Sequence, residues 1–306
     1  MSTPLRIGTR GSPLALAQTE LLAAALKSKH PHLALPGGIE VVTITTSGDR
    51  IQDRPLSEAG GKGLFTKEIE EALLANEIDC AVHSMKDMPT VLPDGLVISC
   101  LLPREDPRDA FFATKAKTLD DLPPRAVVGT SSLRRQAIIL ARRPDLQVVT
   151  FRGNVGTRLK KLSEGVVDAT ILAVAGLNRL NQQHLIQCIL EPDVMLPAVA
   201  QGAVGIEVRH NDVATKKLLE AVHCTKTELR VTAERAFLAV MDGSCRTPLA
   251  ALMSEPDPEG RARFDALKAE PDGSRVASVS YLMNVTNLFE ARKLGETAGN
   301  DLLKKL

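Results

Sequence analysis

The sequence predicts an α/β protein with two similar α/β domains and a smaller α+β domain at the C-terminal end. Strand-like apolar segments alternate with segments of helical period over the first two-thirds of the chain. The opening pattern returns near the middle, where residues 128–132 (VGTSS) resemble residues 7–12 (IGTRGS). From Thr225 onward the pattern changes to one helix, a run of alternating strands and a closing helix.

Composition and charge exclude several classes of function. The 306 residues are 44% hydrophobic and 25% charged, as in an ordinary globular protein. The formal charge is +1, from 38 Lys and Arg against 37 Asp and Glu, so no excess positive field attracts a phosphate backbone. The chain has no Trp, one Tyr and seven Phe, which leaves few rings for stacking bases. We therefore expect no nucleic-acid partner.

The cysteines and the N-terminus indicate the compartment. Five cysteines without a CxxC pair suggest neither a disulfide framework nor a metal site. No basic and apolar leader opens the chain, and no apolar run approaches the ~18 residues of a membrane span. We expect a cytoplasmic protein with no membrane partner and, because no exposed apolar stripe demands a partner, a monomer.

The first domain is predicted to begin with a strand over residues 5–9. Ser12 then caps a helix that has Pro13 in its first position. The expected buried face of this helix contains Leu14, Ala17, Leu21, Leu22 and Ala25. Further strands are expected at residues 39–46, 79–84 and 96–102, and a helix with Ile69, Ala72 and Leu73 inward follows the long loop that ends at Gly63.

The second domain repeats this plan. A strand at 126–130 precedes a helix with Leu133, Ala137, Ile138 and Ala141 on one side, and residues 167–171 (VDATI) echo residues 78–82 (IDCAV). The chain is expected to cross between the domains at 103–107 and 196–205 and to return to the first with a strand at 204–209. The predicted domains are residues 1–102 with 203–222, residues 103–202, and residues 223–306, with a hinged cleft between the first two.

The third domain is predicted from turn and cap signals. A capping box, Thr225-x-x-Glu228, opens a helix, and Gly243 stops it. Strands follow at 248–253, 264–269 and 276–282, with a turn at 271–273 and a helix from about residue 286.

Arginines cluster where these strands end. Arg134 and Arg135 occupy the first turn of a helix, where the helix dipole disfavours cations unless an anion is bound. The alternative is solvated charge on a surface helix. Arg10 beside Ser12 poses the same question, and further cations follow other strands at Arg152, Arg158 and Arg179. Because ligands bind at the carboxyl edge of an open α/β sheet, the cluster predicts a small polyanionic ligand.

Four other features are weighed as candidates for chemistry. Asp87 follows a buried strand at the expected cleft, although an ordinary turn residue is the alternative. His83 is more typical of a hydrogen-bonded core histidine than of a metal ligand. The Gly60–Gly63 stretch with Lys62 lacks phosphate-loop spacing and suits either a lid or a plain loop. Cys245 lies in a loop beside Arg246, which favours a reactive thiolate.

Nine segments together resemble the porphobilinogen deaminase family, also called hydroxymethylbilane synthases, over nearly the whole chain. They are residues 5–18 (LRIGTRGSPLALAQ), 60–65 (GGKGLF), 82–89 (VHSMKDMP), 104–110 (REDPRDA), 128–136 (VGTSSLRRQ), 152–159 (RGNVGTRL), 171–180 (ILAVAGLNRL), 196–207 (LPAVAQGAVGIE) and 230–235 (RVTAER). The resemblance implies two domains of periplasmic-binding-protein type (type II) around a cleft, and a third that carries the cofactor on a loop cysteine.

The resemblance also implies an activity. Four porphobilinogen molecules would be joined head to tail, each losing ammonia, onto a dipyrromethane cofactor bound to Cys245 by a thioether. Hydrolysis would then release hydroxymethylbilane for tetrapyrrole (haem) biosynthesis. Asp87 matches the family's catalytic carboxylate, which stabilises positive charge at pyrrole nitrogen and assists proton transfer.

The remaining roles are carried over position by position. Cofactor carboxylates would be held by Lys62, Ser84, Lys86, Thr130, Ser131, Ser132, Arg134, Arg135, Arg152, Gly153 and Arg158. The incoming substrate would meet Arg10, Ser12, Phe65, Arg179 and Gln201. Many members have a lysine where this chain has Glu58, and we expect Glu58 to face solvent.

Two rival interpretations remain. A non-catalytic small-anion-binding protein of the same two-domain fold explains the arginines but not the third domain with its loop cysteine. A hydrolase using Cys245 and His83 would need its nucleophile at a helix N-terminus or beside its base, whereas Cys245 follows a helix. Both rivals predict a chain without a bound chromophore.

Overall fold

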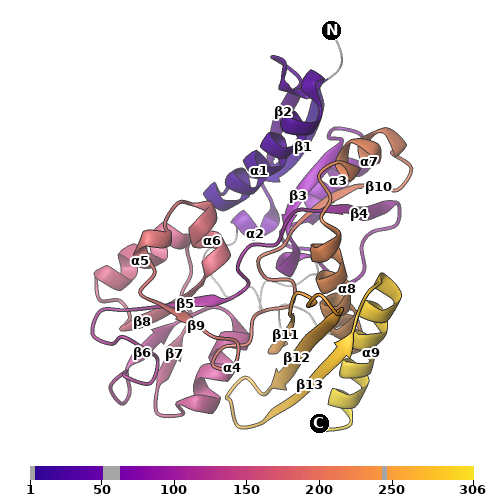
Figure 1. The fold of residues 1–306 in the computed structure, drawn as a ribbon. Helices are drawn as coiled ribbons and strands as arrows, with labels where there is room; N and C mark the ends of the chain where they lie inside the picture. The colour runs from indigo at the N-terminus through magenta and orange to yellow at the C-terminus, as the bar shows by residue number, and fades with distance from the viewer. Residues whose placement is uncertain (1–3, 51–62, 243–246) are drawn as a thin grey trace. The chain divides into compact units, whose positions relative to one another are not determined.

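The computed structural model describes residues 4–50, 63–242 and 247–306 (Figure 1). The chain divides into two compact units, residues 1–104 with 203–227, and residues 105–202 with 228–306. The division into three domains stays a prediction. Within the described residues, no helix combines the length and apolar character that crossing a membrane requires.

The first unit is built on a five-stranded mixed sheet of order β2-β1-β3-β10-β4, in which β1, β2 and β3 are parallel and β10 is antiparallel to its neighbours β3 and β4. Its strands are β1 (Leu5–Arg10), β2 (Ile39–Ile44), β3 (Cys80–Ser84), β4 (Leu96–Leu101) and β10 (Val204–Arg209). Its helices are α1 (Pro13–Lys29), α2 (Ser47–Arg50), α3 (Lys67–Leu74) and α7 (Val213–Glu220), with 3-10 turns η1 (Pro31–Ala34) and η2 (Met85–Asp87).

Two apolar layers enclose this sheet. Leu22 and Leu26 of α1 and Leu219 of α7 pack with strand residues on one face. Ile69 and Leu73 of α3 pack on the other face. Figure 1 shows α1 running along β1, where the two elements are in contact. The return of the chain as β10 confirms the predicted strand at 204–209.

The second unit contains a sheet of equivalent order, β7-β6-β8-β5-β9, again with three parallel strands followed by an antiparallel one. Its strands are β5 (Asp109–Ala113), β6 (Val127–Gly129), β7 (Gln147–Val149), β8 (Ala169–Ala173) and β9 (Cys188–Leu190). Its helices are α4 (Leu133–Arg142), α5 (Val155–Ser163) and α6 (Val174–Arg179), with the 3-10 turn η3 (Gln183–Leu185).

The two sheets repeat each other at the level of single hydrogen bonds, which confirms the predicted internal repeat. Asp79, just before β3, accepts from the backbone N–H of Arg6 at 2.8 Å. Asp168, just before β8, accepts from the N–H of Val127 at the same distance. The short sequence echo of VDATI and IDCAV therefore marks equivalent strands with an equivalent anchoring carboxylate.

The second unit also holds an antiparallel sheet of order β11-β12-β13. It comprises β11 (Leu249–Met253), β12 (Arg261–Ala269) and β13 (Val276–Asn284), and α9 (Leu288–Leu303) contacts β12 and β13. The predicted turn at 271–273 is present, with the Gly273 N–H donating to the Glu270 carbonyl at 2.9 Å. Two α/β sheets and one α+β layer confirm the predicted fold class.

Two local predictions were wrong. Of the face expected for α1, only Leu22 is buried, and the helix instead buries Ala15, Gln18, Thr19, Leu22 and Leu26. Apolar residues occur on all sides of this helix, so the periodicity of its sequence does not determine which face is buried. In α4, Ala137 and Ile138 of the expected face are buried, but Ala141 is exposed. α8 (Thr225–Val240) begins at Thr225, and the capping box there stays a prediction.

We predict that Gly129→Ala destabilises the protein by about 1–3 kcal/mol, the usual range for overpacking. An added Cβ would lie 2.6 Å from the Phe151 ring, so β6 and Phe151 would have to separate. Thermal unfolding followed by circular dichroism measures the change. Gly156→Ala is the control, because the nearest atom to a Cβ there is 3.7 Å away in an exposed helix turn. Equal melting temperatures for the two variants would contradict the prediction.

Candidate functional site

The predicted anion-binding residues of the second unit follow the carboxyl ends of its parallel strands. β6 leads into Thr130, Ser131 and Ser132, β7 into Arg152 and Gly153, and β8 into α6, which ends at Arg179. The antiparallel strand β5 begins at this same edge, because Asp109 pairs with Ala173, the last residue of β8. One sheet edge therefore gathers residues that lie far apart in the sequence.

Local hydrogen bonds shape the turn that follows β6. The Ser132 hydroxyl accepts from the Arg135 N–H at 3.4 Å, so Ser132 is the N-cap of α4. Thr130 Oγ1 accepts from the Ser132 N–H at 3.1 Å. Ser131 Oγ donates to the Phe151 carbonyl at 3.0 Å, which ties this turn to the end of β7. The three hydroxyls are thus used in building the turn.

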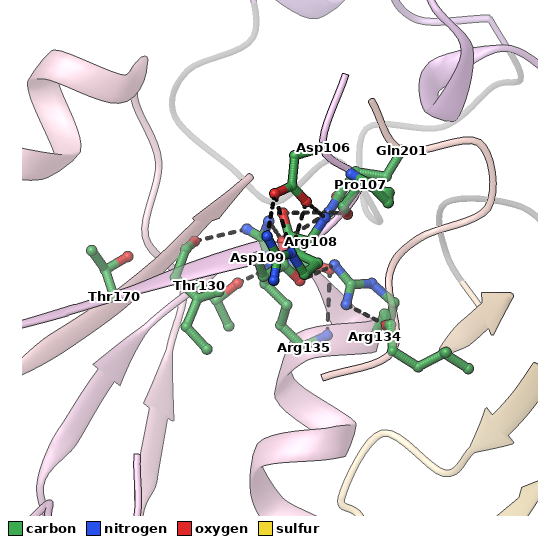
Figure 2. Close-up of polar contacts among 12 residues, drawn as sticks. Asp106, Pro107, Arg108, Asp109, Thr130, Arg134, Arg135, Thr170 and Gln201 are labelled. Carbon is green, nitrogen blue, oxygen red and sulfur yellow. Dashed lines mark hydrogen bonds and ion pairs between the residues drawn. The ribbon is translucent and has the colours of Figure 1, made fainter. Parts of the chain in front are cut away.

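Arg134 and Arg135 find their anion inside the protein. Figure 2 shows both side chains directed at Asp109, the first residue of β5. Arg134 Nη2 donates to Asp109 Oδ2 at 2.8 Å and Arg135 Nη2 to Oδ1 at 2.6 Å. Their other terminal nitrogens donate to the carbonyls of Leu196 and Ile171, at 2.7 and 2.8 Å respectively. Only 5% and 7% of the two side chains is exposed, so neither is a solvated surface charge.

Asp109 is fully buried and accepts a third hydrogen bond, from Gln201 Nε2 at 2.9 Å. Burial by itself raises the pKa of this carboxyl, but the charges and hydrogen bonds of Arg134 and Arg135 outweigh burial and hold the pKa well below its ordinary value. Asp109 is therefore ionised at neutral pH. Gln201 also donates to the Pro107 carbonyl at 2.6 Å, so in this structure it supports Asp109.

The cluster has more positive than negative charge. Arg134 and Arg135 share the single carboxylate of Asp109, which leaves one net positive charge in a buried place. Arg158, in the first turn of α5, lies close enough that burial, then the charges of Arg135 and Arg152, lower its pKa to about 10. The Nε atoms of Arg134, Arg135 and Arg158 are buried without a hydrogen-bond partner among the described residues. Such a set of donors attracts an anion.

Arg179 lies at the end of α6 in the same unit. Its Nη2 donates to the Gly202 carbonyl at 2.6 Å, and burial lowers its pKa. Arg179 therefore holds the backbone at Gly202, where the chain leaves the second unit.

The first unit presents its own predicted residues at the carboxyl ends of β1 and β3. Ser12 caps α1 through its hydroxyl, which accepts from the Ala15 N–H at 3.3 Å. Ser84 Oγ accepts from Gln18 Nε2 at 2.8 Å. Lys86 and Asp87 are half-buried in η2, the turn that directly follows β3. Within the described residues, no hydrogen bond or ion pair joins the Asp87 carboxylate to another group.

Arg10 is already engaged in this unit. Its guanidinium forms a two-pronged ion pair with Asp49, in which Nε donates to Oδ2 at 3.2 Å. The same guanidinium lies 4.1 Å from the centre of the Phe65 ring. These contacts join two of the predicted substrate-binding residues to one another.

Sequence reasoning missed Asp109 and Asp49. Asp109 lies within the segment REDPRDA, but its partners are 25 and 26 residues away and meet it only through the strand order. Asp49 follows β2 in the same way as the other site residues follow their strands. That position was the sequence signal that could have identified Asp49 as a site residue. Lys62, Cys245 and Glu58 lie outside the described residues. In the described part of the chain, no three His, Cys, Asp or Glu side chains form a group that could hold a metal ion.

The fold and this charge distribution define an α/β protein with a buried cluster of arginines around one carboxylate at a sheet edge. Residues 5–217 match the family model described as porphobilinogen deaminase, dipyromethane cofactor binding domain, and residues 228–304 match that of the porphobilinogen deaminase C-terminal domain. The chain belongs to the porphobilinogen deaminase family, whose members are transferases with a dipyrromethane cofactor.

Individual relatives agree with this assignment. The chain is 54% identical to porphobilinogen deaminase of Paracoccus denitrificans over 303 residues, which cover 99% of this chain and 93% of that protein. It is 52% identical to the chloroplastic enzyme of Pisum sativum, covering 98% and 81%. Among solved structures, a putative methionine-binding lipoprotein of Bacillus subtilis aligns with a TM-score of 0.43 and 16% identity, covering 74% of this chain and 92% of that one.

The described residues suit a dipyrromethane. Two pyrroles bring four carboxylates, and the edge of the second unit offers buried guanidinium groups with unpartnered Nε–H donors and a surplus of positive charge. Aliphatic or uncharged polar residues in these places would leave the carboxylates unpaired.

We predict that Asp109→Asn lowers the free energy of unfolding by about 3 kcal/mol, because two buried guanidinium groups lose their counter-ion. Denaturant titration at pH 7 measures the loss. Asp120→Asn is the matched control, since it breaks the exposed Arg142 pair and costs less than about 1 kcal/mol.

The pH dependence of this difference follows from the lowered pKa of Asp109. A carboxyl with a lower pKa in the folded chain stabilises the fold above the unfolded value of ~3.9 and loses that effect as the pH falls further. The gap between the parent and Asp109→Asn should therefore shrink below pH 4. A gap that is constant down to pH 2 would contradict an ionised Asp109.

Proposed function

We propose that this chain catalyses the head-to-tail condensation of four porphobilinogen molecules, with loss of ammonia, and the hydrolytic release of hydroxymethylbilane. The observation that carries the proposal is the surplus of buried guanidinium groups at one sheet edge, in a chain of this family. Each pyrrole brings two carboxylates, so the growing product is a polyanion that many cations must hold.

In this proposal the dipyrromethane is joined to Cys245 by a thioether and supplies the nucleophilic carbon onto which the first substrate is added. Arg152 and Arg158, with Lys62 and Lys86, bind carboxylates directly. Arg134 and Arg135, whose terminal nitrogens already contact Asp109 and backbone carbonyls, add Nε–H donors and a buried positive field. Ser84, Ser131, Ser132, Thr130 and Gly153 shape the backbone around these groups.

Asp87 is the proposed catalytic residue. As ammonia leaves porphobilinogen, positive charge develops on the pyrrole nitrogen, and a nearby carboxylate stabilises it through the N–H. The Asp87 carboxylate has no partner among the described residues and is half-buried, so it is available for this contact. The same carboxylate can accept the proton that the pyrrole carbon must lose.

The substrate-binding role is proposed for Arg10, Ser12, Phe65, Arg179 and Gln201. Arg10 pairs with Asp49 in this structure, and a substrate carboxylate would exchange with that carboxylate on the same guanidinium. We further propose that the protein is a cytoplasmic monomer that acts without a nucleic acid, a membrane or a metal.

The proposal is tested by the intact mass of the purified protein. We expect a surplus equal to two porphobilinogens less two ammonias, together with an aldehyde colour reaction for pyrroles. Cys245→Ser should lack both, whereas the control Cys224→Ser, at a half-buried cysteine in the first unit, should keep both. A parent with the bare chain mass, still bare after incubation with porphobilinogen, would instead support the non-catalytic anion-binding protein.

We predict that Asp87→Asn lowers kcat by at least about 100-fold, the usual contribution of a positioned acid–base group. The variant should keep its cofactor, because its arginine cluster is unchanged. Initial rates of hydroxymethylbilane formation and the intact mass provide the two readouts. Asp94→Asn, at an exposed carboxylate further along the same loop, should keep full activity. Activity of Asp87→Asn within threefold of the parent would exclude Asp87 as the catalytic group.

A further inference from the structure

Three ionisable side chains lie near one another in the core of the first unit, behind the strand end that leads to Asp87. His83 of β3 and Glu207 of β10 form a hydrogen bond of 3.0 Å between Nε2 and Oε2, with 5% and 0% of their side chains exposed. Glu70 of α3 is also buried, and it lies close enough for the charges of Glu207 and His83 to affect its pKa. We refer to these three residues as the His83 cluster. The apolar residues of the α3 layer, including Ile69 and Leu73, lie on this same face of the sheet.

The His83 cluster is not an arrangement that maximises the free energy of unfolding. Oε1 of Glu207 and Oε1 of Glu70 are buried without a hydrogen-bond partner among the described residues. Burial, and then the charge of Glu207, raise the pKa of Glu70. Replacing a buried ionic pair by apolar groups of similar volume is often neutral or stabilising. The benefit of these polar groups must therefore lie elsewhere than in the free energy of unfolding.

The location of the cluster indicates what that benefit is. His83 is the penultimate residue of β3, and Ser84 and the η2 turn with Asp87 follow it directly. The Met85 N–H of that turn donates to the Ala203 carbonyl at 3.0 Å, so the turn rests on the start of β10. At Gly205, opposite His83, an added Cβ would lie 2.1 Å from Met85 Sδ, which shows how closely turn and strand approach.

The third member extends the connection to α3. This helix begins at Lys67, two residues after Phe65, the ring against which Arg10 lies. Glu70 is in its first turn. The cluster thus joins the strand that leads to Asp87, the strand on which its turn rests, and the helix that follows Phe65.

We propose that His83 and Glu207 are positioning residues for the condensation reaction, and that their directional hydrogen bond, beside the buried Glu70, holds the end of β3 in the orientation that presents Asp87 to the substrate. An apolar core would fill the same space but would let β3, β10 and α3 shift relative to one another, because dispersion contacts are not directional. This inference rests on the proposed role of Asp87.

The test replaces the pair by apolar residues of similar size in the holoenzyme, as His83→Leu combined with Glu207→Leu. We expect a melting temperature equal to or above that of the parent and a full complement of cofactor by intact mass. We expect kcat to fall at least tenfold with KM within threefold, because the carboxylate-binding arginines are untouched. A well-folded double variant with kcat within threefold of the parent would overturn the proposal.

A conservative variant covers the case in which the double variant does not fold. Glu207→Gln keeps the shape of the side chain and an oxygen that accepts a hydrogen bond from His83, so this variant should retain at least one-third of the parent kcat. In Glu207→Leu alone, kcat should fall at least tenfold. Equal kcat values for these two variants would also overturn the proposal. Asp87→Asn, assayed in parallel, separates the two claims. An active Asp87→Asn contradicts the proposed catalytic role of Asp87, while an inactive one beside an active His83→Leu/Glu207→Leu contradicts only the positioning role.

Discussion

The buried contact of one carboxylate with two guanidinium groups organises the second unit. Asp109 begins the antiparallel strand of the sheet, and Arg134 and Arg135 occupy the first turn of α4. Each arginine also donates to a backbone carbonyl, so the contact joins β5, α4, β8 and the segment around Leu196. Two cations with one counter-ion leave an uncompensated charge in a low dielectric, where it acts strongly on any anion that approaches. The same contact thus connects the strands and supplies the field of the site.

The internal repeat explains how one architecture provides two chemically different edges. Both units anchor a parallel strand with an aspartate, Asp79 or Asp168, that accepts the same backbone hydrogen bond. The edges then diverge in charge. In the first unit Arg10 is balanced by Asp49, and Asp87 adds a carboxylate. In the second unit the arginines outnumber their carboxylate.

Buried polar groups accompany the proposed chemistry in each unit. The second unit buries the salt-bridged cluster of Asp109, Arg134 and Arg135, and the first buries the His83 cluster directly behind the turn that carries Asp87. Among the described residues, both clusters have polar atoms without hydrogen-bond partners, which an apolar core would avoid. Such groups make a particular arrangement of strands more favourable than its close alternatives, because a shifted strand would lose a directional contact. The proposed benefit in the first unit is the orientation of Asp87.

The sequence by itself determined the local features of this protein. Strand and helix alternation, the caps at Ser12 and Ser132, the turn at 271–273 and the repeat of the two halves are all encoded within a few residues. The positions of the arginines after strands also predicted that they share one edge of the sheet, because parallel strands end at a common edge. Motif order was enough to identify the family.

Only the tertiary structure decided which groups meet across the sheets. Nothing local shows that Arg134 and Arg135 pair with Asp109, since the contact depends on β5 lying antiparallel beside β8. The sequence also did not determine the buried face of α1, because apolar residues occur on all sides of that helix. The face that packs against the sheet is the one that becomes buried. Periodicity reports the conformation of a segment, whereas the partners of a buried charge follow from strand order, which brings together residues that no short window of sequence contains.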